Sequence, residues 1–302
     1  MLIQLLEKQG DNFRRTYAAK ALGDTGDPLA AAALTKALTD KDWMVRKSAV
    51  ESLEKVGGKL SLEELINLAK HHDRVVAEKA IASLGDLRDP QALDTLVALL
   101  EDPQRMEHAR DALVKFGKPA VPILIDTVQS KISFIQGAAA HALGEIGSKD
   151  AVPALVEALR TGTWPICIIT AKALEKLGWR PETAADQALY AISRRQWDVV
   201  RKLGAQAFDL LKDALQERAL RVEVLQALGG IGHPDALDVL LPYLEDRSWQ
   251  VRKAAAQGLM ALHQSAALSD AQKLKILKQK RSITAKHQDR MIHQDYAECA
   301  KP

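Results

Sequence analysis

Apolar residues recur along this chain with the spacing of helices. Val45, Ala49, Leu53 and Val56 stand three or four positions apart, which places them on one face of a helix. Strands would instead alternate apolar and polar residues, and long stretches of that kind are missing here. The pattern therefore predicts an all-α protein.

A tripeptide resembling Ala-Leu-Gly recurs near the end of these helical stretches. Successive copies are separated by 31, 31, 29, 30 and 31 residues, then by 54, and finally by 31. Each period accommodates two helices, A and B, and stacked hairpins of this kind bury apolar faces that one hairpin leaves exposed. We predict an α-solenoid of about nine stacked helical hairpins. The copies begin at Ala21, Ser52, Ser83, Ala112, Ala142, Ala173, Ala227 and Gly258.

Helix boundaries can be assigned from local signals. A glycine such as Gly147 follows helix A, where it can adopt the left-handed conformation that ends a helix. Ser61 and Glu64 form a capping-box pattern at the start of a helix B, and Asp150 with Pro153 indicates another start, with Asp150 as its N-cap.

The repeat changes between residues 178 and 217. Residues 196–203 provide about two helical turns where a complete helix A is expected. Two interpretations remain open: a packing variant, or a notch for a partner lined by Trp179, Arg180, Tyr190 and Trp197. Trp43, Trp164 and Trp249 each lie nine residues before the tripeptide of their repeats. We interpret all three as packing residues near the start of helix A.

Charge and composition complete the domain assignment. The chain has 302 residues and a net charge of +3, but residues 273–302 contain eight Lys or Arg and three Asp or Glu, so the remaining body carries −2. We assign residues 1–272 to the solenoid and 273–302 to a basic capping helix and tail. A body with this charge argues against a nucleic-acid partner.

Two segments resemble the helix-A signature of HEAT repeats, D-x-x-V-R-x-x-A. They are residues 42–49 (DWMVRKSA) and 248–255 (SWQVRKAA). Residues 143–147 (LGEIG), followed by 151–159 (AVPALVEAL), resemble the phycobilisome-lyase-type subclass of HEAT-like repeats. The resemblance covers about residues 10–265. It implies a helical solenoid, and its members include both scaffolds and bilin lyases.

The sequence contains no recognised catalytic signature. It has no G-x-S-x-G, H-E-x-x-H or P-loop motif. Deoxyhypusine hydroxylase, another HEAT-like protein, holds iron with His-Glu dipeptides, and the eight histidines here form none. A bilin lyase of the phycobilisome type, or a subunit of one, is the enzymatic alternative. We expect no cofactor and assign no catalytic residue.

The tail contains the weak metal-ligand candidates. His287 and Asp289 are followed at the same spacing by His293 and Asp295, but the arrangement matches no standard zinc site. We therefore assign no metal. Cys167 lies in an apolar helical stretch and is interpreted as a core residue.

These observations favour a protein-binding scaffold that contacts its partner through the concave face formed by the B helices. Charges of both signs alternate there, which suits a specific protein partner. We expect a monomer with no transmembrane segment or signal peptide, located in the cytoplasm. The candidate contact residues are Lys36, Lys70, Asp126, Gln129, Glu157, Arg160 and Lys212.

Overall fold

The computed structural model describes residues 1–7, 11–56, 60–265 and 268–278, and these contain helices but no strands. The predicted all-α repeat fold is confirmed. The helices form two compact units. The first comprises Met1–Ala158 with Lys172–Trp179, and the second comprises Leu159–Ala171 with Arg180–Pro302.

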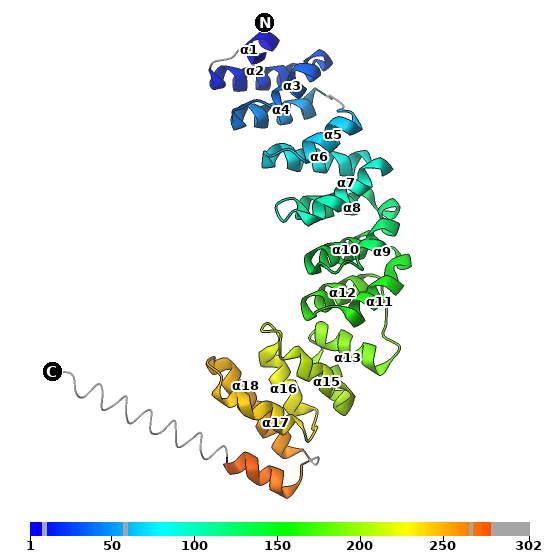
Figure 1. The fold of residues 1–302 in the computed structure, drawn as a ribbon, viewed down its shortest axis with the longest axis vertical. Coiled ribbons are helices and arrows are strands. Elements are labelled where there is room, and N and C mark those ends of the chain that lie inside the picture. Colours follow the sequence, from blue (N-terminus) through cyan, green and yellow to red (C-terminus); the bar gives the residue numbers. More distant parts are fainter. Residues whose placement is uncertain (8–10, 57–59, 266–267, 279–302) are drawn as a thin grey trace, which may run out of the picture. The chain divides into compact units, whose positions relative to one another are not determined.

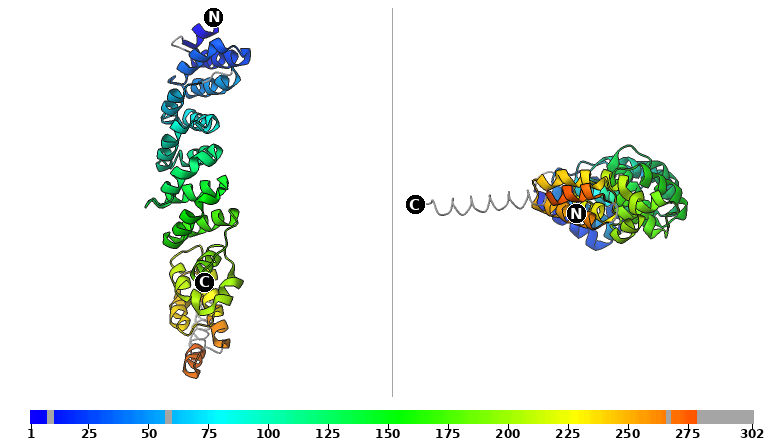
Figure 2. Two further views of the ribbon diagram at one scale, coloured as in Figure 1. Left: turned by 90° about the vertical axis from the view of Figure 1, so that its right-hand side faces the viewer. Right: turned by 90° about the horizontal axis from the view of Figure 1, so that it is seen from below.

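In the first unit a short helix α1 (Leu2–Glu7) precedes hairpins stacked in chain order (Figures 1 and 2). The A helices lie on one side of the stack and the B helices on the other (Figure 1). The A helices are α2 (Asn12–Thr25), α4 (Trp43–Lys55), α6 (Arg74–Leu87), α8 (Met106–Phe116) and α10 (Ser133–Ile146). The B helices are α3 (Ala31–Ala37), α5 (Leu62–Ala69), α7 (Leu93–Ala98) and α9 (Val121–Thr127).

Two helices, α11 (Val152–Thr161) and α12 (Trp164–Lys176), contribute residues to both units. The second unit continues with six helices and a helical segment at residues 270–278. The six are α13 (Ala184–Ser193), α14 (Trp197–Leu203), α15 (Phe208–Ala214), α16 (Arg221–Gly230), α17 (Ala236–Leu240) and α18 (Trp249–Gln264). Helix α14 has only seven residues, which confirms the predicted shortening of one helix A.

The central leucine of the tripeptide is buried in all eight copies. It is therefore the repeated core residue, and its recurrence explains why the period was legible in the sequence. The buried copies are Leu22, Leu53, Leu84, Leu113, Leu143, Leu174, Leu228 and Leu259.

The glycine of the tripeptide brings neighbouring A helices into close contact. A β-carbon at Gly85 would lie 2.8 Å from Cα of Ala112, and one at Gly144 would lie 2.7 Å from Cα of Ala173. Such distances are too short for any side chain, so the contact requires glycine. The sequence places Glu54 at the equivalent position of the second repeat.

Most of the predicted helix ends are confirmed. Gly147 has φ 78° and ends α10, and Ser61 and Glu64 form the reciprocal capping box of α5. The assignment of Asp150 as an N-cap is wrong. A 3-10 turn begins already at Lys149 after Ser148, whose hydroxyl donates to the Asp150 carboxylate at 3.1 Å. Asp150 thus lies inside the first turn.

Candidate functional site

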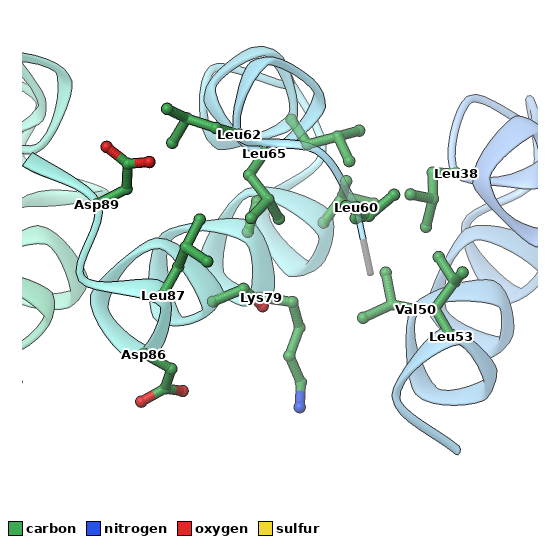
Figure 3. Close-up of a pocket in the computed structure, with 14 residues that line it drawn as sticks. Leu38, Val50, Leu53, Leu60, Leu62, Leu65, Lys79, Asp86, Leu87 and Asp89 are labelled. Atoms are coloured by element: carbon green, nitrogen blue, oxygen red, sulfur yellow. The ribbon is translucent and has the colours of Figure 1, made fainter. Parts of the chain in front are cut away.

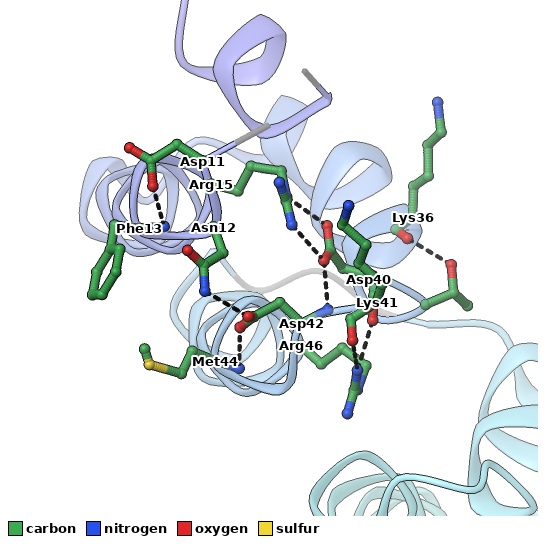
Figure 4. A network of polar contacts seen from close by, with 11 residues as sticks. Asp11, Asn12, Phe13, Arg15, Lys36, Asp40, Lys41, Asp42, Met44 and Arg46 are labelled. Atoms are coloured by element: carbon green, nitrogen blue, oxygen red, sulfur yellow. Dashed lines mark hydrogen bonds and ion pairs between the residues drawn. The ribbon is translucent and has the colours of Figure 1, made fainter. Parts of the chain in front are cut away.

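The arginine of the D-x-x-V-R segment fastens one repeat to the next. Arg46 donates to the carbonyl oxygens of Asp40 and Lys41 at 2.7 and 3.0 Å (Figure 4). Its Nε donates to the Asp73 carboxylate at 2.8 Å. In the second unit, Arg252 donates to two carbonyl oxygens of the preceding turn in the same way. The recurring arginine therefore stabilises the fold.

The aspartate of the same segment has a structural role too. Asp42 accepts from the backbone N–H of Met44 at 2.9 Å, which caps α4, and from Asn12 Nδ2 at 2.6 Å (Figure 4). The Asn12 hydrogen bond is the main cause that lowers the pKa of Asp42 below its ordinary value. Since Asn12 belongs to α2, this carboxylate also joins the starts of two A helices.

The predicted contact residues lie on or directly after B helices, as expected, and all seven are exposed. Lys36, Lys70, Asp126, Gln129 and Glu157 belong to the first unit, and Arg160 and Lys212 belong to the second. Their role in binding stays a prediction.

Lys36 and Arg160 each pair with a carboxylate of the same chain. Lys36 Nζ lies 3.1 Å from Glu7 Oε1. Arg160 makes two hydrogen bonds, of 2.8 and 2.7 Å, to the buried Asp186, and this pairing is the main cause that lowers the pKa of Asp186. Replacing Arg160 would therefore disturb the fold as well as any binding surface.

The notch candidates are divided between the units. Trp179 is the last residue of the first unit, and Arg180, Tyr190 and Trp197 belong to the second. Trp197 is the first residue of α14 and is half-buried, as is Tyr190 on α13, whereas Arg180 is exposed. The notch also stays a prediction.

The three equivalent tryptophans have different environments. Trp164 is buried, and its indole N–H donates to Asp213 at 3.0 Å. Trp43 and Trp249 are 58% and 60% exposed. The packing interpretation therefore holds for Trp164 and is wrong for Trp43 and Trp249, because more than half of the surface of each stays exposed.

Exposed apolar residues lie at the starts of four A helices in the first unit. Trp43 is the first residue of α4, and the second residues of α2, α6 and α10 are Phe13, Val75 and Phe134, which are 69%, 37% and 44% exposed. We call these four residues the apolar edge. The Asn12–Asp42 and Arg46–Asp73 bonds show that the starts of α2, α4 and α6 are neighbours.

An apolar pocket adjoins the first end of this edge. It has a volume of about 530 Å³ and is lined by Leu2 and Leu5 of α1 and by Phe13, Arg14, Tyr17 and Ala18 of α2. Figure 4 shows the Phe13 ring pointing away from the polar network beside it. Phe13 therefore belongs both to the edge and to a concave apolar surface.

A second pocket, of about 610 Å³, opens between α4, α5 and α6. Figure 3 shows leucine side chains of α5 facing Leu87 of α6 and Val50 and Leu53 of α4. The pocket has apolar side chains of all three helices in its lining. We call it the α5 pocket. Its lining is Leu38, Val50, Leu53, Leu60, Leu62, Leu65, Leu68, Val76, Lys79, Ala80, Ser83, Asp86, Leu87 and Asp89.

HEAT repeats match residues 1–66, 57–113, 105–175 and 208–279, which is most of the chain. The chain belongs to the HEAT-repeat family. It is 29% identical over 234 residues to the phycocyanobilin lyase subunit alpha of Nostoc sp. strain PCC 7120, which covers 73% of this chain and 69% of the relative. The resemblance to the phycobilisome-lyase-type subclass is thereby confirmed.

Two solved structures are similar to the chain at low sequence identity. The complex of CpcE and CpcF of phycocyanin lyase from Nostoc sp. PCC7120 is 23% identical, covers 93% of both chains and gives a TM-score of 0.30. A Kap121p mutant is 12% identical, covers 88% of this chain and 37% of its own, and gives a TM-score of 0.47.

The metal-ligand residue types and Cys167 can be located in the described repeats. Within residues 1–278, apart from the gaps given above, His, Cys, Asp and Glu form no group of three that could hold a metal ion. Burial raises the pKa of the Cys167 thiol to about 11, as suits a core residue. Cys299 and the tail residues His287, Asp289, His293 and Asp295 lie outside the described residues.

The membrane expectation can be compared with the helices themselves. In the described part of the chain, no helix combines the length and the apolar character needed to cross a membrane.

Proposed function

We propose that this chain is a non-catalytic HEAT-repeat scaffold that binds a partner protein, and that the apolar edge of the first unit is its principal contact surface. The observation that carries the proposal is the exposure of large apolar side chains at the first or second residue of four A helices. Clustered exposed apolar surface is typical of protein–protein interaction sites, whereas isolated exposed residues are ordinary.

The residue types on the edge support this function. Aromatic side chains bury a large area with few rotatable bonds and are frequent among residues that dominate binding energy. Trp43, Phe13 and Phe134 are such residues, and the pocket beside Phe13 offers a cavity for an apolar side chain of the partner. The B-helix residues predicted from the sequence, of which Lys70, Asp126 and Gln129 are examples, form a second candidate surface.

Affinity purification of the full chain with quantitative mass spectrometry tests this function. We expect the variant Trp43→Ala/Phe134→Ala to lose a partner that the unaltered chain retains. The matched control is Leu29→Ala, which removes a side chain that is 80% exposed at the turn between α2 and α3. Retention of every partner by the double variant would contradict the assignment of the edge.

A second candidate function is that of a bilin lyase or lyase subunit. Two observations favour it: the relative named as a phycocyanobilin lyase subunit, and the α5 pocket, whose volume of about 610 Å³ is within the range of small-molecule sites. Phycocyanobilin added to the full chain should then change its absorbance spectrum. Filling the pocket with Leu62→Trp should abolish that change, whereas Leu29→Trp should leave it intact. An unchanged spectrum with the unaltered chain would reject this candidate.

A further inference from the structure

The apolar edge is accompanied by basic residues at a repeated position. Two or three residues before the exposed apolar side chain stand Lys41 before Trp43, His72 before Val75, and Lys131 before Phe134. All three are exposed. Each lies in the turn that leads from helix B to helix A, so the basic side chains occupy the same edge as the apolar ones.

The second unit repeats this combination independently. Arg247 precedes Trp249, both are exposed, and Lys253 Nζ lies 5.9 Å from the centre of the Trp249 ring. The repeat that buries its aromatic residue differs. Trp164 is preceded by Gly162, where the repeats of Trp43, Val75, Phe134 and Trp249 have a basic residue. In those four repeats a basic side chain accompanies the exposed apolar one, whereas the repeat of Phe13 has Gly10 at this position.

We infer that the apolar edge binds an extended, acidic segment of a partner protein that carries apolar side chains at regular intervals. This inference rests on the proposed function and adds the chemistry of the partner. Basic side chains beside an aromatic row attract carboxylates, while the rings provide apolar contact area.

The carboxylates on this edge are already engaged. Asp42 accepts from Asn12 and from the start of α4, and Asp73 is held by Arg46. Asp11 caps α2 and lies 3.5 Å from Arg14. Each of these carboxylates is hydrogen-bonded or paired with groups of this chain. Each therefore reduces the positive potential of the edge less than an unpaired carboxylate would.

Two pairs of opposite charges lie on these helices near the edge. Lys47 lies 4.0 Å from Glu51, and Arg74 pairs with Glu78. Glu107, on the second position of α8, is exposed. Since α8 contributes no member of the apolar edge, this acid lies beside a repeat without an exposed ring and does not oppose Lys41 or Lys131.

The spacing of the repeats sets the register of the segment. Packed helices lie roughly 10 Å apart, and an extended chain rises about 3.3 Å per residue, so one repeat corresponds to about three residues. A segment with an apolar residue at every third position and acidic residues between them matches the edge. A phosphate backbone matches it poorly, because its charges are denser than one basic residue per repeat and the capping aspartates would lie next to them.

The test uses a fluorescein-labelled peptide of about twelve residues, with Leu at every third position and Glu or Asp elsewhere. Its binding to the full chain is measured by fluorescence anisotropy. We expect Lys41→Glu/Lys131→Glu to weaken binding by about tenfold or more. The control Lys118→Glu/Lys149→Glu changes the net charge equally at the turns that precede α9 and α11, and should leave binding within about twofold.

Three outcomes would overturn the inference: no binding at about 1 mM peptide, equal weakening by both charge reversals, or tighter binding of oligothymidylate than of the peptide. The experiments distinguish a wrong inference about the acidic partner from a wrong proposed function. If Trp43→Ala/Phe134→Ala loses a protein partner while the acidic peptide does not bind, the scaffold function stands and the acidic chemistry is wrong. If Trp43→Ala/Phe134→Ala retains every protein partner and Lys41→Glu/Lys131→Glu does not weaken peptide binding, both the proposed function of the edge and the inferred acidic partner are wrong.

Discussion

The crossing of α16 and α18 allows a sharp test of the packing argument, because two adjacent glycines on α16 have opposite surroundings. A β-carbon at Gly229 would lie 2.0 Å from the carbonyl oxygen of Gly258 and 2.4 Å from its Cα. A β-carbon at Gly230 would meet only the side chain of Arg201, at 2.9 Å, and that side chain is half exposed. The same substitution at the two positions should therefore have different effects.

The magnitudes follow from two competing terms. Replacing glycine by alanine inside a helix stabilises it by about 1 kcal/mol, and inserting a methyl group into closely packed backbone costs about 3 kcal/mol or more. Gly229→Ala should therefore lower the free energy of unfolding by about 2 kcal/mol. Gly230→Ala, at the last position of α16, should leave it unchanged or raise it by up to about 1 kcal/mol, because Arg201 can move aside.

Urea unfolding followed by far-UV circular dichroism measures both variants. Because repeat proteins can unfold in parts, amide hydrogen exchange in α16 and α18 should be measured as well. Gly229→Ala should accelerate exchange in both helices. If Gly229→Ala is as stable as Gly230→Ala, backbone contact between these helices does not hold the repeats together.

Three further outcomes are expected. Arg15 is buried and donates two hydrogen bonds to the carboxylate of Asp40. Arg15→Ala should therefore lower the free energy of unfolding by about 3 kcal/mol; a loss below about 1 kcal/mol would contradict this. The pKa of Asp186 is lowered by Arg160. The pair therefore stabilises the protein at pH values above the ordinary pKa of 3.8, and this contribution disappears as the pH falls through the lower pKa of the folded state. Asp186→Asn should accordingly flatten the dependence of thermal stability on pH in the acid range. Since the pKa of Cys167 is raised to about 11, a Cys299→Ser chain should react with iodoacetamide at pH 8 roughly a hundredfold slower than a free thiol, and equal rates would show that the thiol is accessible.

Local signals were sufficient for much of the fold. The recurring leucine, the glycine ends and the capping box predicted helices whose positions the structure confirms. The two-turn stretch at residues 196–203 predicted the short α14. These features depend on neighbouring residues along the chain, so the sequence contains all that is needed to recognise them. The prediction of Asp150 as the N-cap was wrong because the helical turn begins after Ser148, two residues earlier. Both Ser and Asp favour helix starts, so the sequence did not distinguish them.

The candidate site depended on contacts between repeats. The sequence placed Trp43, Trp164 and Trp249 at one position of the repeat and could not distinguish their exposure, because a residue 49 positions away covers Trp164. The sequence likewise did not reveal the ion pair of Arg160, because its buried partner Asp186 lies 26 residues away.

The sequence by itself determined the repeat and its one short helix, because a solenoid is built from local periodicity and each hairpin contacts mainly its neighbours in the chain. Only the tertiary structure decided which surfaces are open. The apolar edge and the α5 pocket arise where one repeat meets the next. Whether an apolar side chain is covered there depends on the distance between stacked helices, and a glycine at the crossing point permits the closest approach.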